Sequence, residues 1–277
     1  MVKRRRKRRS GALIAWVSVG VVVALVATFV LIKELSGSNA EATNFPPLSS
    51  ATFSELTHIP ASVYDQVGVS SPIVQVLPPN VFKNQPKLEL NGLPGTFYYG
   101  AEYCPYCAAT RWGIAAALAR FGSWHNNTLY TMWSASNDVA PNTPTMSFYR
   151  TTYTSPNFSF TGYEVEDRNR NPLMSLPPEI NHLVRHYNPG LSFPFMDIGN
   201  KVMITGSAFD PNVLQGYKTQ SQIAALLDQP NNYITQAIIT TANYVSAGLC
   251  SIAKDPPASV CNSAGVKAAA TALKLRP

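Results

Sequence analysis

The longest apolar stretch of the chain lies close to its N-terminus. Residues Gly11 to Ile32 carry no charged side chain and are rich in Val, Ala, Leu and Ile. As an α-helix this stretch would span the hydrocarbon core of a bilayer, which is about 30 Å thick. The basic run Lys3 to Arg9 directly precedes it, and such runs stay on the cytoplasmic side. We therefore expect a basic cytoplasmic tail over residues 1–10 and a transmembrane helix over residues 11–32.

A cleaved signal peptide is the alternative interpretation of this N-terminus. Ser38-Asn39-Ala40 offers a small-x-small cleavage site. The apolar core of a signal peptide, however, usually spans about 7–15 residues, which is shorter than this stretch. A retained anchor makes the chain a single-pass protein of the cell membrane, with its C-terminal domain outside the cytoplasm. Residues 33–57 are Ser-, Asn-, Thr- and Pro-rich without a period, which predicts a linker.

Beyond the linker, the pattern alternates between helix-like and strand-like stretches. We expect a short helix over 61–67, strands over 88–90 and 96–101, a helix over 108–121 and a strand over 128–133. The order strand, helix, strand predicts a βαβ unit in which the strands 96–101 and 128–133 run parallel. Two further β-rich runs, 146–154 and 158–165, are interpreted as an inserted strand pair.

The C-terminal half shows a second strand pair followed by helices. A helix is expected over 179–187, and strands over 194–198 and 201–205 flank Gly199-Asn200, two residues that tolerate the positive φ of a tight hairpin turn. Further helices are expected over 220–227, 233–249 and 265–275. The pattern thus predicts an α/β domain over residues 58–249 and a helical C-terminal extension over residues 250–277.

Charge excludes one class of function. The formal net charge is +7, but seven of the 22 Lys and Arg residues lie in the N-terminal run, so the remaining 15 match the 15 Asp and Glu. A nucleic-acid-binding face needs a basic patch on the folded part of the chain. We therefore expect no nucleic-acid partner.

The four cysteines form two pairs that are close in sequence, Cys104 with Cys107 and Cys250 with Cys261. An even number of cysteines outside the cytoplasm indicates disulfide chemistry. Cys250 and Cys261 enclose a loop whose closure as a structural disulfide would add up to about 3 kcal/mol of stability. A second redox pair that passes electrons to Cys104 is the alternative for these two residues.

The motif Cys104-Pro105-Tyr106-Cys107 combines a dithiol with a predicted helix start. Unpaired N–H groups and the macrodipole at a helix N-terminus favour an anion, so they favour the thiolate of Cys104. Pro105 suits the first helical turn because its missing N–H needs no partner there. Cys107 lies one turn further on, where it can attack a mixed disulfide formed at Cys104.

Three other roles for this cysteine pair stay open. His182 and His186 could complete a zinc site with the two thiols, although histidines at this spacing more often share a helix face. The pair could form a purely structural disulfide, although so small a ring restrains little chain entropy. The domain could also keep the motif and bind a partner without catalysing a reaction. The sequence contains no other ligand set, so we expect neither a bound metal nor an organic cofactor.

Two landmarks of the sequence resemble the thioredoxin superfamily. Residues 97–107 resemble the strand, active-site turn and helix start of that superfamily. Residues 192–202 resemble the strand opposite the dithiol, which begins at a proline with a cis peptide bond and turns through a glycine-containing hairpin. The resemblance covers residues 86–228, with an insertion between the third strand and the proline, as in DsbA-like members. The string 102–112 and the paired C-terminal cysteines more closely resemble an exported family known as domain of unknown function 929.

The resemblance implies a thioredoxin-like fold and a thiol–disulfide oxidoreductase or isomerase that acts on thiols and disulfides of exported proteins. Cys104 would attack, Cys107 would resolve, and this pair would cycle between dithiol and disulfide. Pro194 and the preceding Phe193 would hold the substrate strand. A membrane protein could serve as the redox partner. A non-catalytic or Cu(I)-handling thioredoxin-like module is the alternative, since soft thiolates suit Cu(I).

Such chemistry needs a proton acceptor near the resolving thiol. Glu102, two residues before the first cysteine, and Glu89, on the preceding strand, are the candidates in the sequence. Arg111 lies one turn beyond Cys107 and is interpreted as an exposed helix residue, with stabilisation of a thiolate as the alternative. Trp112 is expected in the core.

Overall fold

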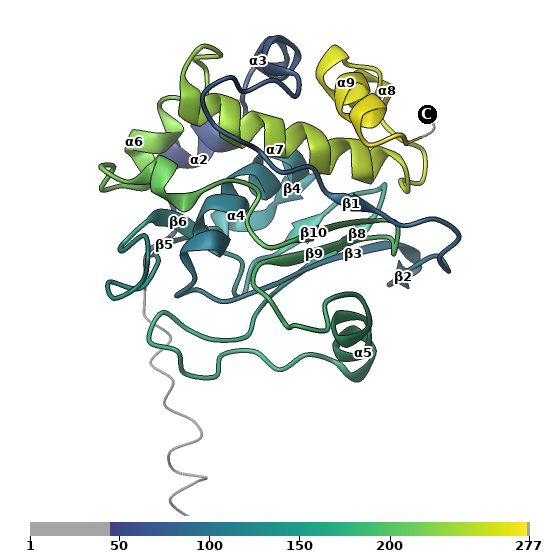
Figure 1. Ribbon diagram of the computed structural model, residues 1–277, viewed down its shortest axis with the longest axis horizontal. Helices are drawn as coiled ribbons and strands as arrows, with labels where there is room; N and C mark the ends of the chain where they lie inside the picture. Colours follow the sequence, from purple (N-terminus) through teal and green to yellow (C-terminus); the bar gives the residue numbers. More distant parts are fainter. Residues whose placement is uncertain (1–44, 276–277) are drawn as a thin grey trace, which may run out of the picture. The chain divides into compact units, whose positions relative to one another are not determined.

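A mixed β-sheet organises residues 45–275, the part of the chain that the computed structural model describes (Figure 1). The expected tail and transmembrane helix lie outside these residues. In spatial order the main strands are β1 (Asn80–Val81), β10 (Val202–Thr205), β9 (Phe195–Ile198), β3 (Leu93–Gly100) and β2 (Glu89–Leu90), and β8 (Ser159–Glu164) also pairs with β3. The β3–β8 pair is parallel and the others are antiparallel. The predicted α/β class is therefore confirmed.

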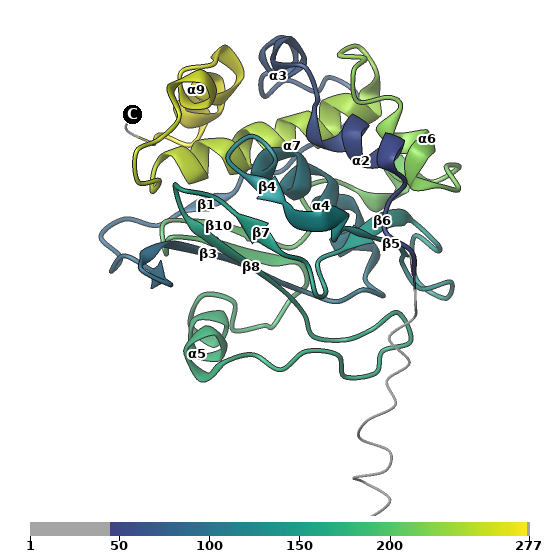
Figure 2. The same cartoon turned by 180° about the vertical axis from the view of Figure 1, so that it is seen from behind.

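Helices cover both faces of this sheet. Helices α4 (Pro105–Leu118) and α7 (Tyr233–Cys250) lie on one face, and α5 (Pro178–Tyr187) lies on the other, as Figures 1 and 2 show. The side chains of β3 alternate between the two layers: Tyr98 belongs to the core beneath α4 and α7, whereas Phe97 and Tyr99 pack towards α5. The result is a three-layer arrangement with β3 at its centre.

Helix α4 is buried on every side rather than along one stripe. All its residues except Tyr106 are buried. A Cβ atom on Gly113 would lie 2.5 Å from the Cβ of Thr241 on α7, so the close approach of the two helices requires glycine at this position. Trp112 is fully buried, as predicted, and its indole N–H donates to the carbonyl of Pro144 at 3.0 Å. The helix that begins at the dithiol is therefore held from all directions.

The predicted βαβ unit is wrong in its second strand. The stretch expected as the parallel partner forms β5 (Tyr130–Trp133), which pairs antiparallel with β6 (Pro144–Ser147) in a separate two-stranded sheet. The parallel partner of β3 is β8, which buries every second residue, whereas β5 buries only Met132. The interpretation of the runs 146–154 and 158–165 as an inserted strand pair is also wrong, because the second run forms β8 of the main sheet and the first contributes to β6 and β7 (Tyr153–Thr154), which pair elsewhere. The inserted elements therefore lie between α4 and β8. They also include β4 (Ser123–Trp124), η1 (His125–Asn127) and β7.

Several local predictions are confirmed. Helix α3 (Ala61–Val67) has the predicted bounds, and α5 begins one residue before the predicted helix. The β9–β10 hairpin turns at Gly199 and Asn200, whose φ angles are 66° and 56°. Helices α6 (Gln220–Ala224), α7 and α9 (Ala264–Ala272) occupy the predicted C-terminal helical stretches, and η2 (Pro211–Leu214) precedes them.

The folded unit begins before residue 58, within the predicted linker. It runs from Phe45 and includes α2 (Ser50–Thr57), which Ser49 caps by accepting the N–H of Thr52. Leu48 and Leu56 are buried in the main core. Two leucines are enough to hold this segment against the core, so its overall composition remains typical of a linker. No helix within residues 45–275 is long and apolar enough to cross a membrane.

The C-terminal extension belongs to the same folded unit. A disulfide joins Cys250, at the end of α7, to Cys261, at the end of α8 (Ala258–Cys261). Beyond it, α9 contributes Val266 and Ala269 to the main core. The position of the disulfide between two helix ends is consistent with the predicted structural role.

Candidate functional site

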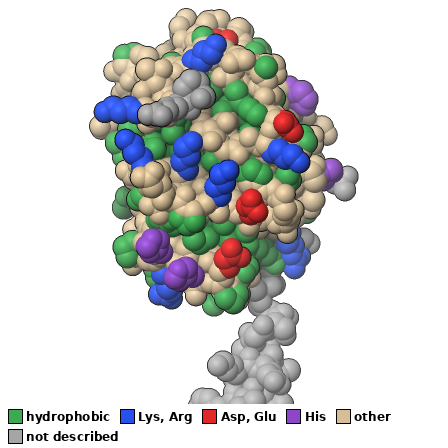
Figure 3. All heavy atoms as spheres, turned by 90° about the vertical axis from the view of Figure 1, so that its right-hand side faces the viewer, with side chains coloured by type: hydrophobic (Ala, Val, Ile, Leu, Met, Phe, Trp, Pro, Cys, Tyr) green, Lys and Arg blue, Asp and Glu red, His purple; other side chains and the backbone are tan. Residues whose placement is uncertain are grey.

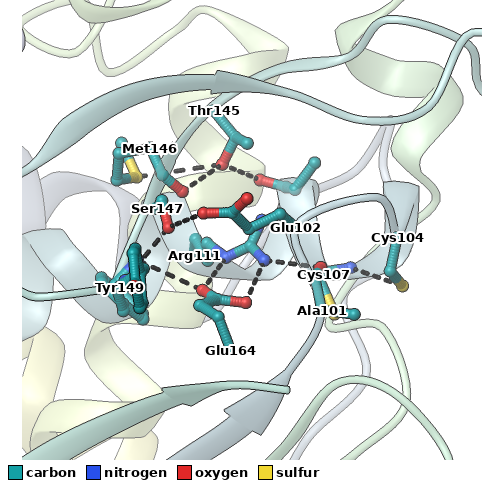
Figure 4. Close-up of polar contacts among 12 residues, drawn as sticks. Ala101, Glu102, Cys104, Cys107, Arg111, Thr145, Met146, Ser147, Tyr149 and Glu164 are labelled. Atoms are coloured by element: carbon teal, nitrogen blue, oxygen red, sulfur yellow. Dashed lines mark hydrogen bonds and ion pairs between the residues drawn. The ribbon is translucent and has the colours of Figure 1, made fainter. Parts of the chain in front are cut away.

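The two free thiols lie at the start of α4, where the sequence placed them (Figure 4). Cys104 is the N-cap residue, Pro105 occupies the first turn, and the Cys104 sulfur accepts the backbone N–H of Cys107 at 3.3 Å. Cys104 is 4% exposed and Cys107 is fully buried. One sulfur thus faces the free N–H groups of a helix start, and the other lies a turn inside the protein.

The surroundings separate the acidities of the two thiols. The hydrogen bond with the Cys107 side chain lowers the pKa of Cys104, and the backbone N–H groups of Cys107 and Tyr106 and the charge of Arg111 act in the same direction against the opposing effect of burial. Burial raises the pKa of Cys107 well above its ordinary value, and the neighbouring Cys104 adds to this. Cys104 is therefore the more acidic of the two thiols and becomes a thiolate at the lower pH.

A buried ion pair lies beneath the dithiol. The Nε of Arg111 donates to Oε1 of Glu164 at 2.8 Å, its Nη2 donates to Oε2 at 2.6 Å, and Nη2 also donates to the carbonyl of Ala101 at 2.7 Å. Both charged side chains are completely buried. The interpretation of Arg111 as an exposed helix residue is therefore wrong, because α4 has no solvent-facing side at this position.

Tyr98 belongs to the same buried cluster. The guanidinium carbon of Arg111 lies 5.7 Å from the centroid of the Tyr98 ring. Burial raises the pKa of this phenol well above its ordinary value, and the pKa is also sensitive to the charges of Arg111 and Cys107. Within residues 45–275, neither the Tyr98 hydroxyl nor Nη1 of Arg111 has a hydrogen-bond partner. Two hydrogen-bond donors without a partner thus lie in the cluster that surrounds Cys107.

Of the two candidate proton acceptors, only Glu102 is close to the dithiol, since it lies two residues before Cys104 in the sequence. It is 4% exposed, and its Oε1 accepts the hydroxyl of Ser147 at 2.6 Å. Burial, with the nearby charge of Glu164, raises its pKa to about 7, while the Ser147 hydrogen bond opposes the rise. Glu89 is exposed on β2 and pairs with Pro94 near the start of β3, at the end of the strand opposite the dithiol. The candidacy of Glu89 is therefore wrong.

The raised pKa of Glu102 predicts a pH-dependent stability. Its ordinary pKa is 4.5 and its folded pKa is about 7, so between these values the folded state binds more protons than the unfolded state. The free energy of unfolding should fall as pH rises through this window, by at most about 1.4 kcal/mol per pH unit from this group. Urea unfolding of the full chain at pH 5 and pH 8 measures the fall, and Glu102→Gln should reduce it.

Glu89→Gln is the matched control, since it changes an exposed carboxyl to an amide and should leave the pH dependence unchanged. Some dependence should persist in Glu102→Gln, because burial also raises the pKa of Asp197 to about 7. Equal pH dependence in Glu102→Gln and the unmodified chain would contradict the assignment.

Phe193 and Pro194 lie beside the loop that leads to Cys104. The Phe193–Pro194 peptide bond is cis. Pro194 directly precedes β9, whose Phe195 is the register partner of Tyr99 near the end of β3. The ring centroid of Phe193 is 4.9 Å from that of Tyr99 and 6.3 Å from that of Tyr103, the residue before the first cysteine. The structure therefore brings the two predicted substrate-binding residues to the dithiol end of the sheet.

No zinc site of the kind that the alternative requires is assembled in the described part of the chain. His182 and His186 stack on α5 with 6.3 Å between their ring centroids, and α5 covers the face of the sheet opposite α4 (Figure 1). Among residues 45–275, no three His, Cys, Asp or Glu side chains gather as a metal site would require.

A basic cleft lies at the other end of the sheet. Its volume is about 820 Å³, and Lys83, Lys87, Lys201 and Lys274 line it together with one carboxylate, Glu89. Figure 3 shows the face on the right-hand side of Figure 1, where basic side chains are prominent. The cleft includes residues from the start of β3 and from the β9–β10 turn, so it is remote from the dithiol, which follows the end of β3.

Sequence reasoning missed Tyr98, Glu164 and Ser147 as parts of the site. One signal was present: Arg111 is the only charged residue in the helix 105–118, and a lone charge in an otherwise uncharged buried helix requires a buried partner. The partner could not be chosen from the sequence, because Glu164 lies 53 residues away on β8.

One known protein family matches most of the folded part of the chain. Residues 80–251 match the family described as "Domain of unknown function (DUF929)", which confirms this part of the resemblance. Comparison with curated proteins and with solved structures found no match.

Proposed function

Because the chain belongs to the DUF929 family, whose description assigns no activity, we propose its function from the site: a thiol–disulfide oxidoreductase that acts on exported proteins through Cys104 and Cys107. One observation carries the proposal. The Cys104 sulfur accepts an N–H at a helix start and its pKa is lowered, while Cys107 is fully buried one turn away with a raised pKa. Two-step disulfide exchange requires one thiol that ionises readily and attacks, and a second thiol within reach that resolves the mixed disulfide.

The exchange proceeds in two balanced steps. The Cys104 thiolate attacks one sulfur of a substrate disulfide, so that a mixed disulfide forms and the other substrate sulfur leaves as a thiolate. Cys107 then loses its proton to solvent or to the departing thiolate and attacks the Cys104 sulfur. The substrate is released as a dithiol, reduced by two electrons, and the Cys104–Cys107 disulfide is formed. The reverse sequence oxidises a substrate dithiol.

The buried cluster supports the second step. Cys107 must pass through a thiolate in a fully buried position, which burial disfavours. The positive charge of Arg111 lowers the pKa of Cys107, and the unpartnered donors of Arg111 and Tyr98 lie in the same cluster. We assign these two side chains the role of positioning residues that make the Cys107 thiolate less costly.

The strand arrangement supports a thioredoxin-like fold for this domain. A central strand leads into the dithiol helix and is flanked by a parallel strand and an antiparallel one, and the antiparallel strand follows a cis proline and turns through a hairpin. In this arrangement Phe193 and Pro194 would hold the substrate backbone beside Cys104.

The cellular setting follows from the N-terminal sequence. We propose that residues 11–32 anchor the chain as a single-pass protein of the cell membrane and that the dithiol lies outside the cytoplasm. The disulfide between Cys250 and Cys261 suits an oxidising compartment. Repeated turnover then requires a dithiol or disulfide partner to restore Cys104 and Cys107, and a membrane protein could supply it.

Reduction of insulin by dithiothreitol tests the proposed activity. The full-length chain should accelerate the reaction, and Cys104→Ser should return it to the uncatalysed rate because no thiolate remains to attack. The double variant Cys250→Ser/Cys261→Ser is the matched control, since it removes the other cysteine pair and should keep the activity wherever it stays folded. A chain that binds Cu(I) through its dithiol but leaves insulin reduction unaccelerated would favour the Cu(I)-handling module.

A further inference from the structure

The exposed large apolar side chains of residues 45–275 are concentrated in one place. There are five of them, and their exposed fractions are 73% for Ile73, 53% for Leu77, 41% for Tyr106, 62% for Val139 and 36% for Leu191. All except Leu191 line a single groove of about 640 Å³. Scattered exposed apolar residues need no explanation, whereas a contiguous patch of them marks an interaction site.

The groove adjoins the dithiol. Tyr106, one of its lining residues, lies between the two cysteines. One wall is the segment 73–77, in which the N–H of Leu77 donates to the carbonyl of Ala208 at 2.8 Å. The N–H of Ala208 in turn donates to the hydroxyl of Thr110 on α4 at 3.1 Å. Segment 73–77 is therefore linked through Ala208 to the helix that begins at Cys104.

The chemistry of the lining selects an apolar occupant. Asp210 is the only charged residue that lines the groove, and its Oδ1 accepts the backbone and side-chain N–H groups of Asn212, each at 2.9 Å. An occupant with many charges would lose hydration and find a single counter-charge at most, the carboxylate of Asp210. The volume is in the range of sites that take several side chains of a ligand.

We propose that this groove binds an extended apolar segment of an incompletely folded exported protein, next to the cysteine that Cys104 attacks. The inference rests on the proposed function and specifies its substrate class. An occupant beside Tyr106 must present a sulfur to Cys104, and apolar side chains near a cysteine are accessible in an unfolded chain but buried in a folded one. Ile73 and Leu77 precede residue 80, where the family match begins, so part of the specificity comes from outside the matched region.

The test uses the full-length chain with Cys107→Ser and two peptides, each with one cysteine blocked as a mixed disulfide with thionitrobenzoate. Cys104 attacks the peptide sulfur, the Cys104–peptide disulfide forms, and coloured thionitrobenzoate leaves with the electron pair of the broken bond. One peptide carries Leu, Val and Phe around its cysteine, and the other carries Ser, Gly and Asn. The apolar peptide should react on the order of tenfold faster, the effect of burying about one large apolar side chain.

Substitutions in the groove test whether the groove causes the preference for the apolar peptide. Adding Ile73→Ser, Leu77→Ser and Val139→Ser together should bring both peptides to the same rate, whereas Leu191→Ser, which removes the exposed apolar side chain outside the groove, should keep the preference. Circular dichroism checks that the triple variant is folded. If it is not, Ile73→Ser alone, at the most exposed of these positions, should lower the rate ratio. Equal rates for both peptides with the unmodified groove, or an unchanged preference in the triple variant, would overturn the proposal.

Two further measurements separate this inference from others. The symmetric thionitrobenzoate disulfide has no peptide side chains, so it should react with Cys104 at the same rate in all groove variants. Failure of this small disulfide to react would reject the proposed exchange itself, whereas its reaction without any peptide preference would reject the groove alone. A dimer in sedimentation experiments that the triple variant dissociates would show that a second copy of the chain is the occupant, and would also overturn the proposal.

Discussion

Chains with Cys107→Ser are expected to accumulate disulfide-linked adducts between Cys104 and substrate proteins. The first step needs only the Cys104 thiolate, which the helix start stabilises. The second step needs a thiol one turn away, and without it only thiols from solution can release the substrate. Because well-placed intramolecular groups act at far higher effective concentrations than dissolved ones, the adducts should persist at least on the order of 100-fold longer.

Non-reducing electrophoresis of membranes that contain the full-length variant measures these adducts. Cys104→Ser should give none, because serine cannot attack a disulfide, and the double variant Cys104→Ser/Cys107→Ser should behave in the same way. Adducts that survive in Cys104→Ser would assign the attack to another cysteine. If Cys107→Ser forms no adducts where a control oxidoreductase does, the oxidoreductase proposal fails and the α/β fold remains.

The second large effect is a loss of stability in Glu164→Gln. The substitution leaves the Arg111 guanidinium buried opposite a neutral amide, and arginine cannot escape by losing its proton. Removal of one partner of a buried ion pair typically costs about 3–5 kcal/mol. Guanidinium chloride unfolding of the full chain should therefore show a reduction of this size in the free energy of unfolding.

The matched control is Asp138→Asn, the same carboxyl-to-amide change at the ion pair between Asp138 and Arg170. There the two side chains are 18% and 46% exposed, so the loss should be below about 1 kcal/mol. The double variant Arg111→Met/Glu164→Leu removes both buried charges and should regain most of the stability lost in Glu164→Gln. Equal losses at the two ion pairs would show that burial does not control the strength of the Arg111–Glu164 interaction.

The double variant also separates stability from chemistry. It removes the Arg111 charge that lowers the pKa of Cys107 together with the Glu164 charge that raises it. Because the effect of Arg111 is the larger of the two, the pKa of this thiol should still rise where the fold is stable. Alkylation of Cys107 as a function of pH, in a chain with Cys104→Ser, measures this shift. An unchanged alkylation profile would leave Arg111 with a purely structural role.

Most local features of this protein could be predicted from the sequence because they depend on near neighbours. A cysteine followed by proline at the start of an apolar stretch predicts the N-cap position of Cys104, which the structure confirms. Gly199 and Asn200 predict the β9–β10 turn because both tolerate positive φ, and both adopt it. The α/β class also follows from local alternation between strand and helix patterns.

The tertiary structure alone decided which distant segments pair. Strand β8, and not the stretch 128–133, lies beside β3, because a strand's partner depends on how two faces are covered and not on its own pattern. This pairing places Glu164 against Arg111, gives the buried helix its counter-charge and surrounds Cys107 with the cluster that tunes it. The sequence by itself determined the dithiol and the turn chemistry, which are set by adjacent residues. The charged surroundings of the dithiol and the apolar groove beside it were decided only by packing between segments far apart in the chain.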